Sequence, residues 1–246
     1  RFFTGNRCER GEGKTLNTRK APNIYAYKME RFFDFYKPAA LAPRGKIGLV
    51  RALNMYEDYP FWFTFFTNLG YEVVISGKSD AAMYYKGMTS VPSDSLCYPA
   101  KLAHGHVVDL VEKGVQTIFY PCLPYNLKDS LNPSDNHYNC PVVAAYGENI
   151  RNNMDILKQK QVKLIEPFLP LSDVKRMEER LMEVFAPEGI TRAELKPALN
   201  AAYAELEHYK EDVRAYGSRI YKEATKAGKT VILLVGRPYH IDPEIN

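Results

Sequence analysis

The chain contains 246 residues, of which 46% are hydrophobic and 25% charged, and its formal net charge is +4. This globular composition excludes collagen-like repeats, coiled coils and wholesale disorder. The small positive excess does not favour nucleic acid as a partner. The longest aromatic run, residues 61–66, is far shorter than the roughly 20 residues that span a bilayer. We therefore expect a cytoplasmic protein that binds neither nucleic acid nor membrane.

Residues 1–44 show no sustained periodicity and carry several glycines and prolines among many charges. We interpret them as an N-terminal arm or linker, with a short amphipathic stretch at residues 25–36. The chain begins at Arg1 and ends at Asn246, shortly after a strong strand pattern. We therefore expect it to be a piece of a longer polypeptide.

Alternating strand and helix patterns begin at residue 46, and strands separated by helices predict right-handed crossovers. The sequence thus predicts an α/β domain over residues 45–170, with a doubly wound, mostly parallel sheet. Short apolar runs predict the strands, and capping glycines and prolines delimit the helices. The expected strands are 46–52, 71–76, 115–120, 142–146 and 162–166, and the expected helices are 59–69, 80–86 and 99–113.

The remainder of the chain has a different pattern. Helices at 172–185 and 192–227 predict a helical segment over residues 171–228. A further apolar run at 229–235 reads as a strand. We expect residues 229–246 to be the first strand and loop of a second, truncated α/β unit.

Three cysteines lie in predicted loops. Cys122 follows a strand at its carboxyl end, where open α/β sheets bind ligands. It belongs to a loop of about twenty residues, and loops of that length are usually functional. Cys97 immediately precedes a helix, whose N-terminal dipole favours a thiolate. Cys140 ends the long loop, and each of the three has a proline within two positions.

Iron–sulfur clusters bind thiolates and are tuned by neighbouring amides and burial. Tyr98, Tyr120 and Tyr138 flank the three cysteines, where they would shield such a group from water. The spacing matches no compact ferredoxin or zinc-finger pattern. Three buried thiols that only pack in the core therefore stay an open alternative. Cys8 is either a fourth ligand from the arm or an exposed thiol.

Other candidate motifs are weaker. Two Gly-Lys-Thr segments, at 13–15 and 228–230, lack the first glycine of a phosphate loop, so we expect no ATP hydrolysis by this chain alone. His137 is the better candidate for a proton donor, because it lies close to Cys140 in sequence. His104 and His106 are two positions apart on one helix and point to different faces. Either one of them lines the site, with His104 our choice for a catalytic role, or both are ordinary surface or satisfied core histidines.

Several long segments together resemble one family, the acyl-CoA dehydratase activase-related proteins, also described as activators of (R)-2-hydroxyglutaryl-CoA dehydratase. The resemblance covers essentially the whole chain. The segments that carry it are LNMYEDYPFWFTFF (53–66), PSDSLCYPAKLAHGH (92–106), FYPC (119–122), NHYNCP (136–141) and GRPYHID (236–242).

The resemblance implies a Rossmann-like fold similar to the cluster-binding subunits of 2-hydroxyacyl-CoA dehydratases. In those subunits three cysteines hold a 4Fe–4S cluster, and Cys97, Cys122 and Cys140 match them by position. The fourth iron site would then be open or held by Cys8. We expect the cluster to be lost often in aerobic preparation. ATP would bind only in upstream domains.

The implied function is electron transfer in anaerobic metabolism. An actin-like ATPase activator domain, fused or separate, would supply the electron, and an acyl-CoA dehydratase or an acyl-CoA substrate would receive it. A non-redox docking domain that links the ATPase to its client, with its cysteines empty or binding zinc, is the alternative. A metal-free enzyme that binds CoA thioesters is a third possibility.

Overall fold

The computed structural model describes residues 22–38, 41–128 and 134–245 and contains one four-stranded parallel sheet. The strands are β1 (Lys46–Leu49), β2 (Glu72–Ile75), β3 (Thr117–Phe119) and β4 (Lys163–Ile165), in the order β2-β1-β3-β4. The helices are α1 (Ile24–Met29), α2 (Met55–Asn68), α3 (Ala81–Gly87), α4 (Tyr98–Glu112), α5 (Pro141–Asn153), α6 (Asp155–Gln159), α7 (Val174–Phe185) and α8 (Arg192–Lys226), with short helical turns η1 (Glu30–Asp34), η2 (Met88–Ser90), η3 (Ala186–Glu188) and η4 (Pro238–Ile241).

The sheet is doubly wound, as predicted. The connection through α2 places β2 on one side of β1, and the connection through α3 and α4 places β3 on the other side. The strand order therefore reverses between β1 and β3. In open α/β sheets this switch point opens a crevice at the carboxyl ends of the strands, where ligands bind.

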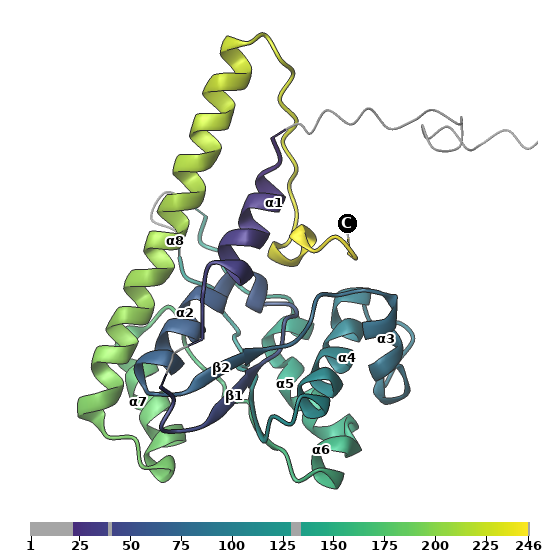
Figure 1. The fold of residues 1–246 in the computed structure, drawn as a ribbon, viewed down its shortest axis with the longest axis vertical. Helices are drawn as coiled ribbons and strands as arrows, with labels where there is room; N and C mark the ends of the chain where they lie inside the picture. The colour runs from purple at the N-terminus through teal and green to yellow at the C-terminus, as the bar shows by residue number, and fades with distance from the viewer. Residues whose placement is uncertain (1–21, 39–40, 129–133, 246) are drawn as a thin grey trace, which may run out of the picture.

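Helices cover both faces of the sheet (Figure 1). On one face α2, α7 and α8 enclose an aromatic core in which Trp62 packs on Phe119 of β3 at 4.6 Å between ring centroids. On the other face α4 and α5 pack against Ile118 of the same strand. Neighbouring residues of β3 thus face opposite cores, as the alternation of side chains along a strand requires.

The long helix α8 begins with a capping box, in which the Thr191 side chain accepts from the Glu194 N–H and the Glu194 carboxylate from the Thr191 N–H. Its first half packs on α2, whereas its second half extends away from the sheet (Figure 1). Arg31 of η1, which is buried, ties the middle of the helix to the N-terminal turn through ion pairs with Glu205 at 2.9 Å and Asp212 at 2.8 Å. Among the described residues, no helix is both long and apolar enough to cross a membrane.

The prediction of a strand at residues 142–146 is wrong, because these residues lie in α5. A short apolar run fits a buried helix as well as a strand. Here the residues at the start of the segment favour a helix. Cys140 is the N-cap, its Sγ accepts from the Val143 N–H at 3.4 Å, and Pro141 occupies the first helical position.

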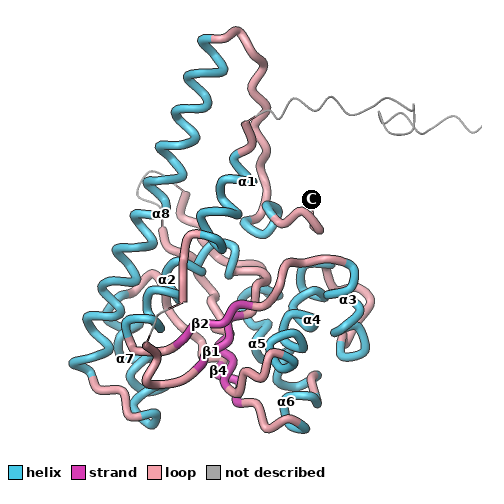
Figure 2. Tube along the Cα trace, viewed as in Figure 1, coloured by secondary structure: helices cyan, strands magenta, loops and turns pink. Residues whose placement is uncertain are grey.

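The prediction of a strand at residues 229–235 is also wrong for the described structure. These residues form an extended loop that descends from the far end of α8 (Figure 2). Because α8 carries the segment away from the sheet, it meets no strand with which to pair. Val231, Ile232, Leu233, Leu234 and Val235 are consequently exposed.

A substitution at the contact between α3 and α4 tests how closely these two helices pack beside the sheet. A Cβ on Gly105 of α4 would lie 1.7 Å from the backbone oxygen of Met83 in α3. We expect Gly105→Ala to lower the free energy of unfolding by about 3 kcal/mol or more, because backbone must move. Chemical denaturation measures the change.

The matched control is Gly217→Ala in α8, where the added Cβ would meet a side-chain carbon at an ordinary 3.4 Å. That substitution should raise stability by about 0.5–1 kcal/mol, since alanine restricts the unfolded chain and favours a helix. Equal effects of the two substitutions would contradict the close approach of α3 and α4.

Candidate functional site

Cys122 lies just beyond β3 at the carboxyl edge of the sheet and is fully buried. Its backbone N–H donates to the Pro167 oxygen at 2.9 Å. Burial raises the pKa of the thiol, whereas backbone hydrogen bonds from Glu148 and Gly147 oppose the rise. A Cβ on Gly147 would lie 3.1 Å from the Cys122 sulfur, so glycine lets the α5 backbone approach it. The sulfur therefore has the amide donors that stabilise a thiolate ligand.

Cys97 and Cys140 occupy equivalent positions at the N-caps of α4 and α5. Each is followed within two residues by a proline in the first turn, whose missing N–H is harmless there. Cys97 is exposed and Cys140 half-buried. The first turn of a helix, with its free amides and the positive end of the helix dipole, therefore follows each of these two cysteines.

The Tyr120 hydroxyl is influenced electrostatically by all three cysteines. This side chain is buried, and burial raises the pKa of its hydroxyl, followed by the effect of nearby Tyr146 and then of Cys122, Cys140 and Cys97. All three sulfur-bearing side chains thus lie within electrostatic reach of one phenol. The candidate site is the region around Tyr120 at the switch point of the sheet.

The tyrosines that surround the cysteines differ from those expected from sequence adjacency. Tyr98 instead donates to Glu244 at 2.7 Å, and Tyr138 is 64% exposed. Tyr146 and Tyr239 take their places. Burial and then Cys97 raise the pKa of Tyr146, and burial and then Cys140 and Cys97 raise that of Tyr239. Tyr239 belongs to the GRPYHID segment, which was the only signal for it in the sequence.

His104 is buried beside this group. Because the Ser90 hydroxyl donates to the Gly87 oxygen at 2.8 Å, Nδ1–H of His104 donates to Ser90 Oγ at 2.8 Å, and Nε2 accepts from the Tyr146 hydroxyl at 2.9 Å. Burial lowers the pKa of His104 to about 4. The ring is therefore neutral, and it orients Tyr146 beside Cys97.

The other histidines lie elsewhere. His106 is buried on a different face of α4, as expected, and lies 3.1 Å from Ser79. Burial lowers its pKa to about 4 as well. His137 is half-buried in the long loop, with Nδ1 3.1 Å from the Asp135 backbone oxygen and its ring 5.5 Å from Tyr125. Cys8 lies outside the described residues.

The two arms of the long loop are held by amide side chains. Asn139, next to Cys140, donates to Asn126 and to the backbone oxygen of Leu123, both at 2.8 Å. Asn126 in turn donates to Glu57 of α2 at 2.9 Å. This chain of hydrogen bonds positions the Cys140 end of the loop relative to the Cys122 end. Sequence reasoning did not identify these residues.

The C-terminal turn η4 is held on the same edge by Asp242, which is buried. Its Oδ2 accepts from the hydroxyls of Tyr56 and Ser79, and its Oδ1 accepts from the Glu244 N–H at 3.0 Å. Since the Ser79 hydroxyl donates to Asp242, Nε2–H of His106 donates to the Ser79 oxygen. This network brings Tyr239 to the cysteines, and the sequence alone did not predict it.

Within residues 22–38, 41–128 and 134–245, no three side chains of His, Cys, Asp or Glu gather closely enough to hold a metal ion. The side chains of Cys97, Cys122 and Cys140 therefore do not form a metal-binding group in this structure.

Residues 46–246 match the family described as the CoA enzyme activase uncharacterised domain (DUF2229). A search of curated proteins finds no match. A search of solved structures finds none either.

The buried histidines predict a pH dependence of stability. The unfolded chain binds protons near pH 6.5, whereas His104 and His106 in the fold resist protonation down to about 4. Their contribution is therefore complete above pH 6.5 and is lost as the pH falls toward 4, by up to about 3 kcal/mol per histidine. Urea denaturation between pH 4 and 7 measures this slope.

Replacing both residues, as His104→Asn with His106→Asn, should flatten that slope. A slope that persists in the double variant would show that other groups cause it.

The three thiols should differ in reactivity. In a Cys8→Ser chain kept reduced and free of metal, we expect iodoacetamide to modify Cys97 first, Cys140 next and Cys122 at least about tenfold more slowly than Cys97, following their exposure. Peptide mass spectrometry over a time course gives the rates. In 6 M guanidinium chloride the rates should converge, and fast labelling of Cys122 in the folded chain would contradict its burial.

Proposed function

Because the chain belongs to the CoA enzyme activase family, matched over residues 46–246, we propose that it is the iron–sulfur electron-transfer module of an ATP-dependent activator system for 2-hydroxyacyl-CoA dehydratases. Cys97, Cys122 and Cys140 are the proposed ligands of a 4Fe–4S cluster.

The proposal is supported by the positions of the three cysteines: Cys122 follows β3, and Cys97 and Cys140 are the N-caps of α4 and α5. Backbone amides of Gly147 and Glu148 bond the Cys122 sulfur, and Cys97 and Cys140 each lie at a helix N-terminus. A single zinc ion requires sulfur atoms within about 4.6 Å of one another, since each Zn–S bond is about 2.3 Å. A four-iron cluster is larger and takes ligands that lie farther apart.

A 4Fe–4S cluster supplies one-electron transfer at a potential set by its hydrogen bonds and solvent exposure. The residues of this chain would hold it and control its surroundings. Tyr120 and Tyr146 are buried and would shield the Cys122 side of the group from water, and exposed Cys97 is the ligand that a partner would reach. His104 keeps Tyr146 oriented. The proposed partners are an actin-like ATPase activator domain and an acyl-CoA dehydratase or its thioester substrate.

Anaerobic reconstitution with iron and sulfide tests the proposal. We expect about four iron and four sulfide per chain, with broad visible charge-transfer absorption. Cys97→Ala, Cys122→Ala and Cys140→Ala should each lose most of the iron and absorption. Circular dichroism of each variant checks that the fold is retained.

Cys8→Ala is the matched control. It should keep the iron content, and a changed spectrum would indicate that Cys8 holds the fourth iron. A colourless chain that contains zinc or no metal would contradict the electron-transfer proposal and would favour the non-redox docking domain instead.

A further inference from the structure

Arg51, in the loop that follows β1, is a buried cation that forms no ion pair within the described residues. The residue is 5% exposed, and its Nε is buried with no hydrogen-bond partner. Its backbone N–H donates to Ser76 at 2.8 Å, and its guanidinium lies 3.8 Å from the ring centroid of Phe33. Within the described part of the chain, the guanidinium forms no ion pair.

Such an arrangement is costly. A buried charge without a partner loses its hydration and gains too little in return, which costs several kcal/mol even after relaxation. By contrast, the buried Arg31 has two carboxylate partners, Glu205 and Asp212. The Phe33 ring offsets only part of the cost for Arg51, since a cation–π contact contributes about 1–2 kcal/mol.

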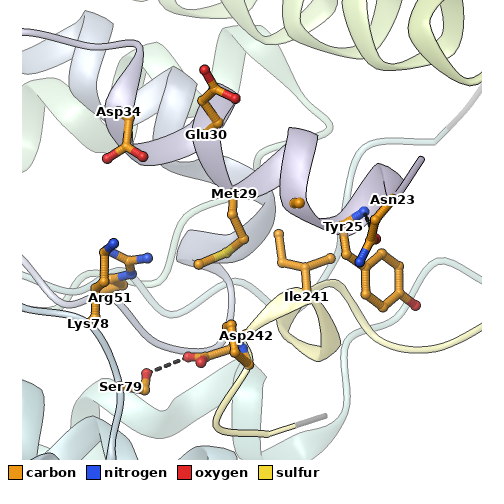
Figure 3. A pocket seen from close by; sticks show the side chains of 12 residues that line it. Asn23, Tyr25, Met29, Glu30, Asp34, Arg51, Lys78, Ser79, Ile241 and Asp242 are labelled. Carbon is orange, nitrogen blue, oxygen red and sulfur yellow. Dashed lines mark hydrogen bonds between the residues drawn. The ribbon is translucent and has the colours of Figure 1, made fainter. Parts of the chain in front are cut away.

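Arg51 faces a pocket of about 740 Å³ between α1, the C-terminal turn and the loop after β2 (Figure 3). This volume is within the range of small-molecule sites, about 300–1,000 Å³. Met29 and Ile241 supply apolar wall, and Lys78 adds a second cation beside Arg51 (Figure 3). The pocket thus combines apolar walls with two positive groups at one side.

No carboxylate that lines the pocket forms an ion pair with Arg51 within the described residues. Asp242 accepts from the hydroxyls of Tyr56 and Ser79 and not from the guanidinium. Glu30 and Asp34 lie across the pocket and are exposed (Figure 3), so solvent and salt screen them. Of the two cations that line the pocket, Arg51 is therefore the one shielded from solvent, whereas Lys78 is exposed.

We propose that this pocket binds a small organic anion, whose carboxylate or phosphate group pairs with Arg51 and Lys78 and whose apolar body packs on Met29 and Ile241. The planar guanidinium fork suits two oxygens of one head group. The proposal does not depend on the cysteines, because none of them lines the pocket.

Calorimetric titration of the metal-free chain tests it, with butyrate and butyl phosphate as anionic probes and butyramide as the uncharged probe of similar size. We expect one of the two anions, or both, to bind and raise the thermal midpoint in a concentration-dependent manner. The stronger of the two identifies the head group. Butyramide binding that equals anion binding would overturn the proposal, as would no binding of either anion.

Arg51→Met keeps the length and apolar packing of the side chain, and it should weaken anion binding at least tenfold. Lys78→Met, at an exposed position, should weaken it severalfold, and this variant keeps the test decisive if Arg51→Met does not fold. Arg176→Met removes an exposed arginine of α7 and should have no effect. Wild-type affinity in a folded Arg51→Met chain, or in Lys78→Met where Arg51→Met does not fold, would refute the assignment.

A chain with Cys97, Cys122 and Cys140 all changed to alanine separates this proposal from that of the cluster. It should bind the anion with wild-type affinity while holding no iron. Loss of anion binding in that folded variant would mean that the pocket depends on the cysteine site, against the proposal.

Discussion

The parallel direction of the four strands is the constraint on which the rest of this molecule depends. In a parallel sheet every strand ends at the same edge, so the loops that follow β1, β2 and β3 meet there although they are far apart in sequence. Arg51, Ser79 and Cys122 all belong to these loops. The reversal of strand order between β1 and β3 then leaves room for a ligand between the loops.

The C-terminal segment completes this edge. It returns from the far end of α8 and inserts Asp242 between hydroxyls contributed by α2 and by the loop after β2. A buried carboxylate with several donors is well stabilised, whereas one left unpaired is costly. One charged side chain therefore positions both Tyr239 at the cysteines and Ile241 at the pocket near Arg51.

The edge contains two separate kinds of polar environment. Around Tyr120, neutral phenols, a neutral histidine and backbone amides surround three thiols. At Arg51 a buried guanidinium, whose Nε has no hydrogen-bond partner, lines a pocket with apolar side chains instead. Both environments depend on the same dry, aromatic core under α2.

Local sequence patterns were sufficient for the elements whose signals lie within a few residues. The strands at 46, 72, 117 and 163, the helix ends at glycine and proline, and the loop positions of Cys97, Cys122 and Cys140 followed from such signals. Residues 142–146 were misassigned because a five-residue apolar run fits strand and helix alike.

The contacts between these elements, by contrast, could be identified only from the tertiary structure. Tyr146 and Tyr239 at the cysteines, Asp242 on Ser79, and the pocket at Arg51 arise from contacts between residues distant in sequence. Residues 231–235 have the sequence pattern of a strand, but they form none. A strand must pair with a neighbour, and only the tertiary structure determines whether that neighbour is present.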